Sequence, residues 1–546
     1  MLGLMQQLPL TTGSLIDHAA RQHGFATVIS RDAGGTLVRT TWAALADRTR
    51  RAASALQALG AEQGDVIATL AWNRTPHLEL YYAVSASGMV LHTVNPRLFP
   101  EQLRFVIENG GARFLCVDPD LLPMVEPLLP SLPRIERVIV LCGSDTLPDS
   151  TITGLLAYED LVAATEPLPA WPDFDENTAA SLCYTSGTTG DPKGCLYSHR
   201  SIVLHAMALC AADSMALSAT DAILLLPPMF HVNAWGVPFA AAMVGAKLVL
   251  PGNRMDGASL HGLLSDEGIT FSLGVPTVWF TLLDHIAATT GADERASLKL
   301  NRVFMGGAAT PRTLVERFRD LLGVETMQAW GMTETSPVAA VCRPLRHQVD
   351  LEPEAALDLR AKAGRGVFGV DFRVEGEDGL TRTHGDPDAG LLKVRGHWVI
   401  SAYYRKVPGS ALDAEGFMDT GDVGWIDDDG FINITDRAKD VIKSGGEWIS
   451  SIELENAAAS HPAVAEAAVV GVPHPRWQER PLLFVRLHPN RDVQVDEMRE
   501  HLAVQVARWC LPDAMIVLDD IPHTASGKVQ KHVLRARFRD YLATSS

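Results

Sequence analysis

The sequence has little of several features that would point to particular classes of protein. Seven cysteines are scattered through 546 residues without a Cys-x-x-Cys pair, which argues against a disulfide framework and a cysteine-based zinc site. No uninterrupted apolar run approaches the roughly 18 residues that a membrane-spanning helix needs, and the amino terminus has no signal-peptide pattern. Acidic residues outnumber basic ones by 65 to 47, and the formal net charge of −18 argues against nucleic acid as a partner. These absences favour a globular protein of the cytoplasm.

Two catalytic signatures are also absent. The sequence contains neither a G-x-x-x-x-G-K-[ST] phosphate loop nor a G-x-S-x-G nucleophile elbow. The first absence argues against the common P-loop ATPases. The second counts against a hydrolase that would use Ser186 or Ser198 together with His231.

The most informative segment that is present is Tyr184–Gly194, which reads Y-T-S-G-T-T-G-D-P-K-G. Its glycines let backbone N–H groups approach a ligand closely, its hydroxyls can bind phosphate oxygens, and Lys193 supplies a cation. An apolar strand is predicted before it, over 179–184, and a helix after it, over 198–212. A strand, a glycine loop and a helix in this order indicate a polyphosphate site rather than a flexible linker.

The length predicts two to four domains. Amphipathic helical patterns alternate with short apolar strands over most of the first 440 residues, which indicates parallel βαβ units. The predicted helices and strands of this part are 42–58 and 77–88, and 66–70, 114–117, 138–141, 222–226, 247–250, 270–273 and 302–305. Further predictions are β-rich segments over 367–374 and 390–394, and a final unit with helices over 451–459 and 495–510 and strands over 466–472 and 482–486.

Six further clusters carry residues suited to nucleotide chemistry. They are M-F-H-V-N-A-W-G at 229–236, G-G-A-A at 306–309, Q-A-W-G-M-T-E at 328–334, T-G-D at 420–422, D-R-A-K-D with K-S-G-G-E-W at 436–448, and S-G-K at 526–528. Each is weak alone, because a single histidine, tryptophan or aspartate is more often structural. In this order, and together with the glycine loop, they resemble the acyl-adenylate-forming superfamily of acyl-CoA synthetases, peptide-synthetase adenylation domains and beetle luciferases. The resemblance covers nearly the whole chain.

The resemblance implies an α/β fold. A large N-terminal domain of βαβ-type sheets flanked by helices would include a β-rich subdomain, and a small α+β C-terminal domain would be mobile. Lys439 occupies the family's hinge position, so the expected domains are 1–438 and 439–546. A homodimer is also implied, although no heptad or interface pattern in the sequence supports it.

The resemblance further implies an ATP site. The glycine loop would hold the β- and γ-phosphates, Gly307 and Trp330 would enclose adenine, and Asp422 would accept hydrogen bonds from the ribose. Mg²⁺, a hard cation that prefers oxygen ligands, would be placed by Glu334 and Thr185. The residues implied to bind ATP or AMP are Thr185, Ser186, Gly187, Thr188, Thr189, Gly190, Lys193, Gly307, Ala308, Ala309, Gln328, Ala329, Trp330, Gly331, Met332, Thr333, Asp422, Ile434 and Arg437.

Two half-reactions are implied as well. A carboxylate would attack ATP to give acyl-AMP and pyrophosphate, and CoA would then displace AMP to form a thioester. Lys528 would neutralise the charge that builds at the carboxylate and α-phosphate in the first step, and rotation of the small domain would replace it for the second. The implied catalytic residues are Lys528, Glu334, His231 and Lys439, and the implied CoA-side loop is Lys443, Ser444, Gly445, Gly446, Glu447 and Trp448.

The segments 92–100, 231–235 and 443–451 resemble those of medium- and long-chain acyl-CoA synthetases and of bacterial 3-methylmercaptopropionate–CoA ligases. We therefore expect a short- or medium-chain fatty acid, or a substituted acid such as 3-methylmercaptopropionate. Alternatives are a long-chain acid, an aryl acid of the cinnamate type, and a non-catalytic nucleotide-binding relative, which the presence of Lys528, Glu334 and Asp422 disfavours. The acyl pocket is expected at His231, Trp235, Gly236, Val237, Gly306, Trp330 and Met332.

Three residues leave questions open at this stage. Trp235 either closes the acyl pocket or gates it. Asp191 adds a negative charge beside the expected phosphate site, and it would weaken phosphate binding unless its side chain points to solvent. Cys195 is expected to be a small buried apolar residue rather than a nucleophile.

Overall fold

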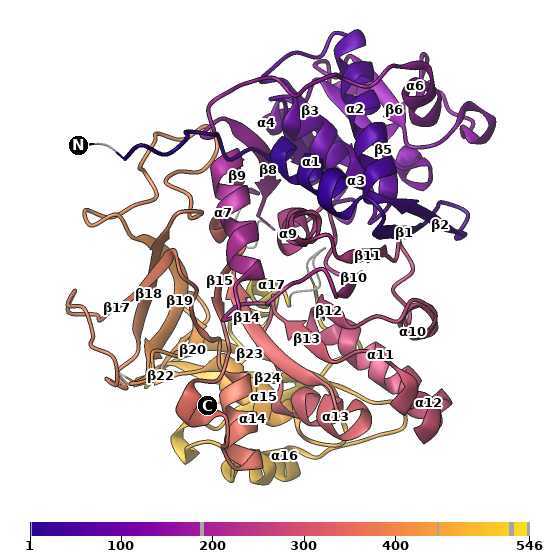
Figure 1. Cartoon of the computed structure of the whole chain (residues 1–546). Helices are drawn as coiled ribbons and strands as arrows, with labels where there is room; N and C mark the ends of the chain where they lie inside the picture. The colour runs from indigo at the N-terminus through magenta and orange to yellow at the C-terminus, as the bar shows by residue number, and fades with distance from the viewer. Residues whose placement is uncertain (2, 186–190, 445–446, 524–528, 543–546) are drawn as a thin grey trace. The chain divides into compact units, whose positions relative to one another are not determined.

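The computed structural model describes residues 1, 3–185, 191–444, 447–523 and 529–542. The chain forms two compact units, which are Met1–Val370 with Arg395–Asp413 (unit 1) and Asp371–Val394 with Ala414–Ser546 (unit 2). Figure 1 labels the helices and strands of both. The expected domain boundary at Lys439 lies inside unit 2 and stays a prediction.

A mostly parallel sheet forms the first part of unit 1. In the described residues it has seven strands in the order β7-β6-β5-β3-β4-β8-β9, and only β9 runs antiparallel to its neighbour. The parallel strands confirm the predicted βαβ units. The strands are β3 Val66–Leu70, β4 Val90–Thr93, β5 Phe114–Val117, β6 Arg137–Val140, β7 Leu156–Ala157, β8 Ala179–Tyr184 and β9 Gly194–Ser198, and the nearby helices are α3 Thr75–Ala86, α4 Pro100–Gly110, α5 Leu122–Val125 and α6 Tyr158–Ala164.

The element that follows the glycine loop differs from the expectation. The loop leads into strand β9, which pairs with β8 so that Cys195 lies opposite Cys183, and helix α7 (His199–Cys210) begins only after that strand. Cys195 and Tyr197 of β9 are buried and Leu196 between them is exposed, which is the alternation of a strand. The loop therefore connects the two strands of the β8–β9 hairpin. The strand predicted over 179–184 and the helix predicted over 198–212 are confirmed by β8 and α7, whereas strand β9 between the loop and the helix was not predicted.

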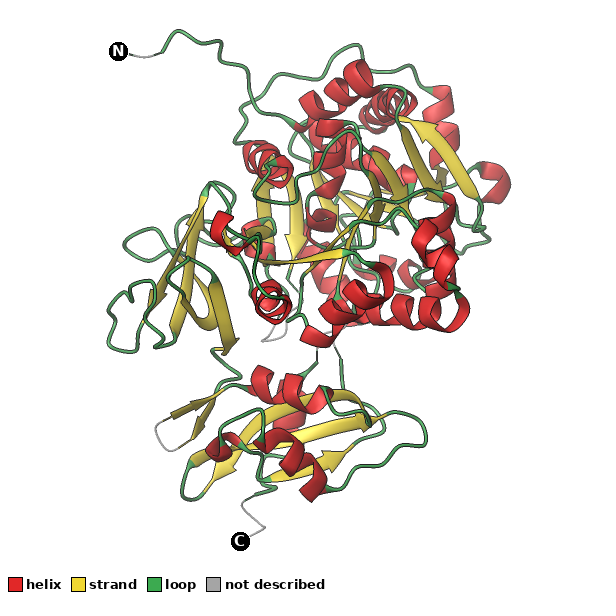
Figure 2. Cartoon of the chain, turned by 60° about the horizontal axis from the view of Figure 1, so that its bottom comes forward, coloured by secondary structure: helices red, strands yellow, loops and turns green. Residues whose placement is uncertain are grey.

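A second, larger sheet completes unit 1. Its strand order in the described chain is β16-β15-β14-β13-β12-β10-β11-β1-β2, with a parallel centre from β14 to β1. Its strands are β1 Thr27–Arg31, β2 Leu37–Thr41, β10 Ala222–Leu225, β11 Lys247–Leu250, β12 Phe271–Gly274, β13 Arg302–Met305, β14 Glu325–Gly331, β15 Val338–Val341 and β16 Arg365–Gly366. The associated helices are α1 Thr12–His23, α2 Trp42–Ala58, α8 Val232–Trp235, α9 Val237–Val244, α10 Gly257–Asp266, α11 Pro276–Thr289, α12 Ala292–Ser297, α13 Arg312–Leu322 and α14 Pro353–Ala361. Figure 2 shows the strands of unit 1 in its interior, with helices around them.

Unit 2 contains two smaller sheets. One has the order β17-β18-β19-β20, and the other has β22-β21-β24-β23 with β25 parallel to β24. Their strands are β17 Val370–Glu375, β18 Gly390–Gly396, β19 Met418–Ile426, β20 Ile432–Arg437, β21 Ile442–Ser444, β22 Glu447–Ile449, β23 Val464–His474, β24 Gln478–Leu487 and β25 Ala514–Val517, and the helices are α15 Ser451–Ala459, α16 Val495–Ala503 and α17 Lys531–Arg537. These elements confirm the expected β-rich segment and the α+β character of the C-terminal region.

The helix predicted over 495–510 is too long, because α16 ends at Ala503. The residues that follow include Val504 and Val506, whose branched side chains restrict a helix. Val506 N and Gln505 N both donate to Leu502 O, so the chain turns here before a short 3₁₀ turn at Arg508–Cys510.

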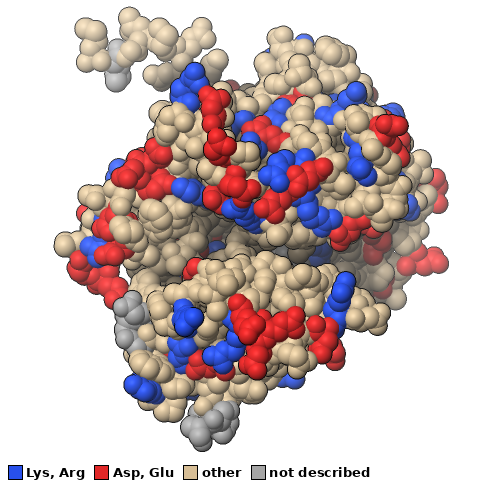
Figure 3. All heavy atoms as spheres, turned by 90° about the horizontal axis from the view of Figure 1, so that it is seen from below, with Lys and Arg blue, Asp and Glu red and all other residues tan. Residues whose placement is uncertain are grey.

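The expectations about membrane spans, cysteines and surface charge bear on the location and partners of the protein. No helix in the described ranges is both long and apolar enough to span a membrane. All seven cysteines lie in those ranges and are free thiols, as expected for a reducing compartment, and the cytoplasmic location stays a prediction. On the face in Figure 3, acidic and basic side chains are interspersed.

Helices α2, α3 and α6 are joined by a partly buried ionic network. Arg48 Nε donates to Glu79 Oε1 at 2.6 Å, and Arg48 Nη2 donates to Glu159 Oε2 at 2.9 Å. The Tyr158 hydroxyl donates to the other oxygen of Glu79 at 2.7 Å. Burial raises the pKa of Glu79, whose side chain is fully buried, while Arg48 opposes that shift. The carboxylate therefore depends on Arg48 to remain charged inside the protein.

We predict that Arg48→Ala lowers the free energy of unfolding of unit 1 by about 3–5 kcal/mol, because it leaves a buried carboxylate without its cation. A matched control is Arg104→Ala, which breaks an exposed i,i+4 pair with Glu108 and costs about 0.3–0.5 kcal/mol. Urea unfolding followed by circular dichroism measures both. Equal losses in the two variants would contradict this account of the network.

Candidate active site

The base of the glycine loop is closed by two hydrogen bonds. Thr185 N donates to Lys193 O at 2.9 Å, and Lys193 N donates to Thr185 Oγ1 at 3.1 Å. Both residues therefore stand at the rim of the loop, directly above strands β8 and β9. The predicted phosphate-binding residues Ser186, Gly187, Thr188, Thr189 and Gly190 lie outside the described residues.

The two unusual residues of the loop differ in burial. Asp191 is exposed to solvent. Cys195 is fully buried, and burial raises the pKa of its thiol well above the usual value. It is a buried thiol rather than a nucleophile, as expected.

A tyrosine that the sequence reasoning missed connects Lys193 to Glu334. The Tyr403 hydroxyl donates to Glu334 Oε1 at 2.7 Å, and Lys193 Nζ lies 4.9 Å from the centre of the Tyr403 ring. The next residue binds the loop itself, since Tyr404 N donates to Gly194 O at 2.7 Å. One short segment therefore holds a cation, a carboxylate and the end of the glycine loop together. A tyrosine pair far from the recognised motifs gave no signal that would have identified it.

Glu334 is largely buried, at 7% exposure, near the start of β9. Its charge helps to raise the pKa of Cys195 and Tyr197, after the larger effect of burial. Among the described residues, no group of three His, Cys, Asp or Glu side chains could hold a metal ion. A carboxylate and the Thr185 hydroxyl suit Mg²⁺ as oxygen donors, and substrate phosphates would have to complete its coordination.

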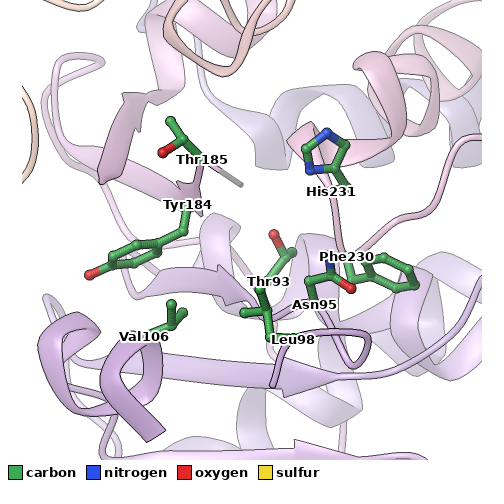
Figure 4. A pocket seen from close by; sticks show the side chains of 8 residues that line it. All are labelled: Thr93, Asn95, Leu98, Val106, Tyr184, Thr185, Phe230 and His231. Carbon is green, nitrogen blue, oxygen red and sulfur yellow. The ribbon is translucent and has the colours of Figure 1, made fainter. Parts of the chain in front are cut away.

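A pocket opens beside the loop in unit 1 (Figure 4). Thr185 and His231 face it from opposite sides, while Phe230 and Leu98 contribute apolar surface. Of the lining residues, only Thr185 and His231 were predicted as site residues. The complete lining is Thr93, Asn95, Leu98, Val106, Tyr184, Thr185, Phe230 and His231.

The chain after His231 forms a left-handed turn. Val232, Asn233, Ala234 and Trp235 have φ values of 48°, 49°, 47° and 59°, and Gly236 follows at 76°. Non-glycine residues normally adopt this conformation singly, at about 1–2 kcal/mol each. The turn is buried throughout, so surrounding contacts must hold it in place. A Cβ on Gly236 would come within 2.5 Å of His205 Nδ1, which explains the glycine at its end.

The turn places the Trp235 indole against the backbone at the end of β13. A Cβ on Gly306 would lie 3.1 Å from this ring and 2.9 Å from Ala329 O, and one on Gly307 would lie 3.8 Å from the ring. Only a glycine lets the indole and the β14 backbone approach each other this closely. The structure thus brings together Trp235 and Gly306, two of the residues predicted for the acyl pocket.

The remaining unit 1 residues of the prediction lie along the same edge. Strand β13 runs parallel to β14 with Met305 opposite Gln328, so the segment after β13 lies beside the end of β14. Gly307, Ala308 and Ala309 are exposed there, and Trp330 is 9% exposed. The other predicted residues on or near this edge are Gln328, Ala329, Gly331, Met332 and Thr333, and Val237 begins α9.

In unit 2, the predicted ribose-binding pair is formed. Asp422 on β19 lies opposite Arg437 on β20, and Arg437 Nε is 2.8 Å from Asp422 Oδ1. Asp422 N donates to Thr420 Oγ1 at 3.1 Å, and Arg437 Nη1 donates to Thr420 O at 3.2 Å. Ile434 lies on the same strand as Arg437 and is half-buried. The pair presents an oriented carboxylate beside a guanidinium, an arrangement suited to a sugar hydroxyl.

The described residues of the predicted CoA-side loop lie on two paired strands of unit 2. Strands β21 and β22 pair with Lys443 opposite Trp448, and Lys443 Nζ lies 5.6 Å from the Trp448 ring. Ser444 is buried and accepts a hydrogen bond from Arg480 at 3.1 Å. Glu447 begins β22. Gly445 and Gly446 lie outside the described residues.

Of Lys439 and Lys528, the two lysines predicted to be catalytic, the structure describes only Lys439. Arg535 Nη2, on α17, donates to Lys439 O at 3.3 Å and to Asp440 Oδ1 at 3.1 Å, so a described contact holds the backbone at the expected hinge. Lys528 lies outside the described residues.

Comparisons with known proteins show which family the chain resembles. Residues 16–404 match the model of the AMP-binding enzyme family, and residues 453–528 match that of the AMP-binding enzyme C-terminal domain. An anthranilate CoA ligase, solved in complex with anthranoyl-AMP, shares the fold with a TM-score of 0.85 at 22% identity over 98% of this chain and 99% of that one.

Two curated relatives match from end to end. The medium-chain-fatty-acid–CoA ligase of Ectopseudomonas oleovorans is 47% identical over 100% of this chain and 99% of its own length. The 3-methylmercaptopropionyl-CoA ligase of Ruegeria pomeroyi is 45% identical over 99% of this chain and 100% of its own. With its α/β fold, its glycine-loop hairpin and these full-length matches to acyl-CoA ligases, the chain belongs to the AMP-binding enzyme family.

Proposed function

We propose that this enzyme joins a carboxylic acid to CoA through an acyl-adenylate, with ATP as the energy source and pyrophosphate and AMP as products. The observation that carries the proposal is the arrangement around Lys193 in unit 1. A glycine loop closed by Thr185 stands beside a pocket with His231 and beside a buried Glu334 that Tyr403 orients. Full-length similarity to acyl-CoA ligases supports the same chemistry.

The acid that we propose is a medium-chain fatty acid. The relative of that specificity matches the whole chain at 47% identity, and the pocket lining includes the apolar side chains of Leu98, Val106 and Phe230. A second candidate is 3-methylmercaptopropionate, which a relative at 45% identity activates according to its name. The two acids differ in length and polarity, so a substrate panel separates them.

For the adenylation step we assign roles by charge. Lys193 and the glycine loop bind the triphosphate, and Lys528 neutralises the carboxylate and α-phosphate as they approach. Asp422, oriented by Arg437, accepts hydrogen bonds from the ribose. Glu334 and Thr185 would hold Mg²⁺, which when bound would neutralise phosphate charge. The leaving group is pyrophosphate, so the glycine loop binds a departing anion rather than a transferred phosphoryl group.

For the thioester step we assign the hairpin from Lys443 to Trp448 to the CoA side, with rotation at Lys439 exchanging it for Lys528. This assignment rests on the family resemblance and on the pairing of Lys443 with Trp448 on strands β21 and β22. The resemblance is also the basis for proposing a homodimer, which sedimentation analysis would test.

The proposed activity predicts acid-dependent exchange of labelled pyrophosphate into ATP in the absence of CoA. Exchange should be greatest with acids of medium length and weaker with acetate, palmitate and cinnamate. A maximum with 3-methylmercaptopropionate would select the second candidate. Exchange with none of the acids would contradict the proposed function, and release of acid from an ester without ATP would indicate a hydrolase.

Lys528→Ala should reduce adenylation by about 10²–10³-fold, because one positive group that faces developing charge is removed. Thioester formation from supplied acyl-AMP should retain most of its rate, since the first step is bypassed. Single-turnover measurements of each half-reaction test this. Arg539→Ala, which removes a charge from an exposed residue further along the chain, is the control and should leave both rates unchanged. Equal loss of the two half-reactions in Lys528→Ala would contradict the assignment of Lys528 to the adenylation step.

Glu334→Gln should lower kcat/KM for ATP by about 10²-fold and raise the Mg²⁺ concentration needed for half-maximal rate, because it removes an anionic ligand. Tyr403→Phe keeps the carboxylate and removes only the hydrogen bond that orients it, so its effect should be smaller, about tenfold. Rates at varied Mg²⁺ and ATP measure both. An unchanged Mg²⁺ dependence in Glu334→Gln would argue against the metal role.

A further inference from the structure

The left-handed turn Val232–Gly236 contains a residue to which the proposed chemistry gives no role. Asn233 lies at the second position of the turn, 2% exposed, with φ of 49°. Asparagine tolerates this conformation better than most residues. Its side chain also makes two hydrogen bonds to another element of the fold.

These hydrogen bonds connect the turn to β8. Asn233 Oδ1 accepts from Ser181 Oγ at 3.1 Å and from Cys183 Sγ at 3.4 Å. Burial raises the pKa of the Cys183 thiol, which therefore keeps its proton and remains a donor at neutral pH. Both donors are buried. A single amide oxygen thus fastens the turn to the strand that leads into the glycine loop.

The approach to the turn is fixed separately by Asn73. Asn73 Oδ1 accepts from Met229 N at 2.7 Å, and Asn73 Nδ2 donates to Leu225 O and Pro227 O at 2.9 Å each. The hydroxyl of Tyr81 also donates to Met229 O. Loss of the Asn233 contacts would therefore leave the chain before His231 anchored, and its effect would be confined to the turn.

Trp235 belongs to this turn, and its indole lies against Gly306 and Gly307. Backbone hydrogen bonds inside the turn, from Ala234 N to His231 O and from Gly236 N to Asn233 O, transmit the position of Asn233 to its neighbours. The turn is strained, so without an external anchor it would relax and the indole would lose its fixed position.

We propose that Asn233 is a positioning residue that fixes the Trp235 wall of the acyl pocket and thereby sets the preference of the enzyme among acids of different length. The inference rests on the proposed function and on the expected place of Trp235 in the acyl pocket. Thr93, which lines the described pocket, lies 3.4 Å from Cys183 Sγ. Cys183, which donates to Asn233, is therefore in contact with a residue that lines the described pocket.

Asn233→Gly is the most informative variant. Glycine adopts positive φ without steric cost, while the two hydrogen bonds of the Asn233 side chain are lost. With Trp235 less constrained, the ratio of kcat/KM for decanoate to that for butyrate should rise by about tenfold, the scale at which pocket contacts discriminate between acids. The KM for ATP should stay within about twofold, because the variant leaves the phosphate-binding residues intact. The ratio between two acids does not depend on the fraction of folded enzyme.

The hydrogen-bond partners and a control complete the test. Ser181→Ala should shift the ratio in the same direction by a smaller factor. The double variant with Asn233→Gly should match Asn233→Gly alone, since the hydrogen bond that Ser181→Ala removes is already lost in Asn233→Gly. Ser272→Ala removes another buried hydroxyl, which donates to Leu224 O on a different strand, and should leave the ratio unchanged.

The outcomes separate the inference from the proposed function. A wild-type enzyme that exchanges pyrophosphate with acids, combined with a proportional loss for all acids in Asn233→Gly, would overturn the inference alone, because that is the signature of a merely structural residue. A shift of the ratio in Ser272→Ala equal to that in Asn233→Gly would also overturn it. A wild-type enzyme without acid-dependent exchange would overturn the proposed function and this inference together.

Discussion

The constraint on which the rest of the structure depends is the repulsion between two anions. A carboxylate must approach the α-phosphate of ATP on a protein whose formal net charge is −18, so positive charge has to be concentrated locally. We propose that the arrangement in unit 1 supplies this positive charge in a fixed geometry. Lys193 stands at the rim of the glycine loop over the Tyr403 ring, and the same tyrosine holds the Glu334 carboxylate. Opposite charges are thus kept beside the loop without collapsing onto each other as an ion pair.

The scaffold around this arrangement holds groups in conformations that they would not adopt alone. The β8–β9 hairpin fixes both ends of the glycine loop, and the left-handed turn from Val232 is held to β8 by Asn233. Both features meet at β8, so the proposed phosphate side and the proposed acid side of the site share one strand. A site that must align two substrates to within a fraction of an ångström benefits from such a common support.

The sequence predicted much of this fold where local pattern and tertiary structure agree. Strand β3, strand β5 and helix α2 begin and end at the predicted residues, because apolar runs and amphipathic periodicity are strong local signals. Strand β9, whose conformation depends on pairing with β8, was not predicted, and the helix that corresponds to α16 was predicted to end too late. Tyr403 and Asn233 were missed as site residues because their roles come from contacts with Glu334 and Ser181, residues distant in sequence. Pattern alone carries no information about such pairs, whereas the Asp422–Arg437 pair was found through motifs.

The central claim is that a carboxylate oxygen attacks the α-phosphorus of ATP. The most direct measurement uses an acid substrate labelled with ¹⁸O in both carboxylate oxygens, with mass spectrometry of the AMP formed in the complete reaction with CoA. Attack by the carboxylate breaks the bond between the α-phosphorus and the bridging oxygen to pyrophosphate, and thioester formation then leaves one acid oxygen on AMP. The account predicts one ¹⁸O atom in each AMP. AMP without ¹⁸O would contradict it.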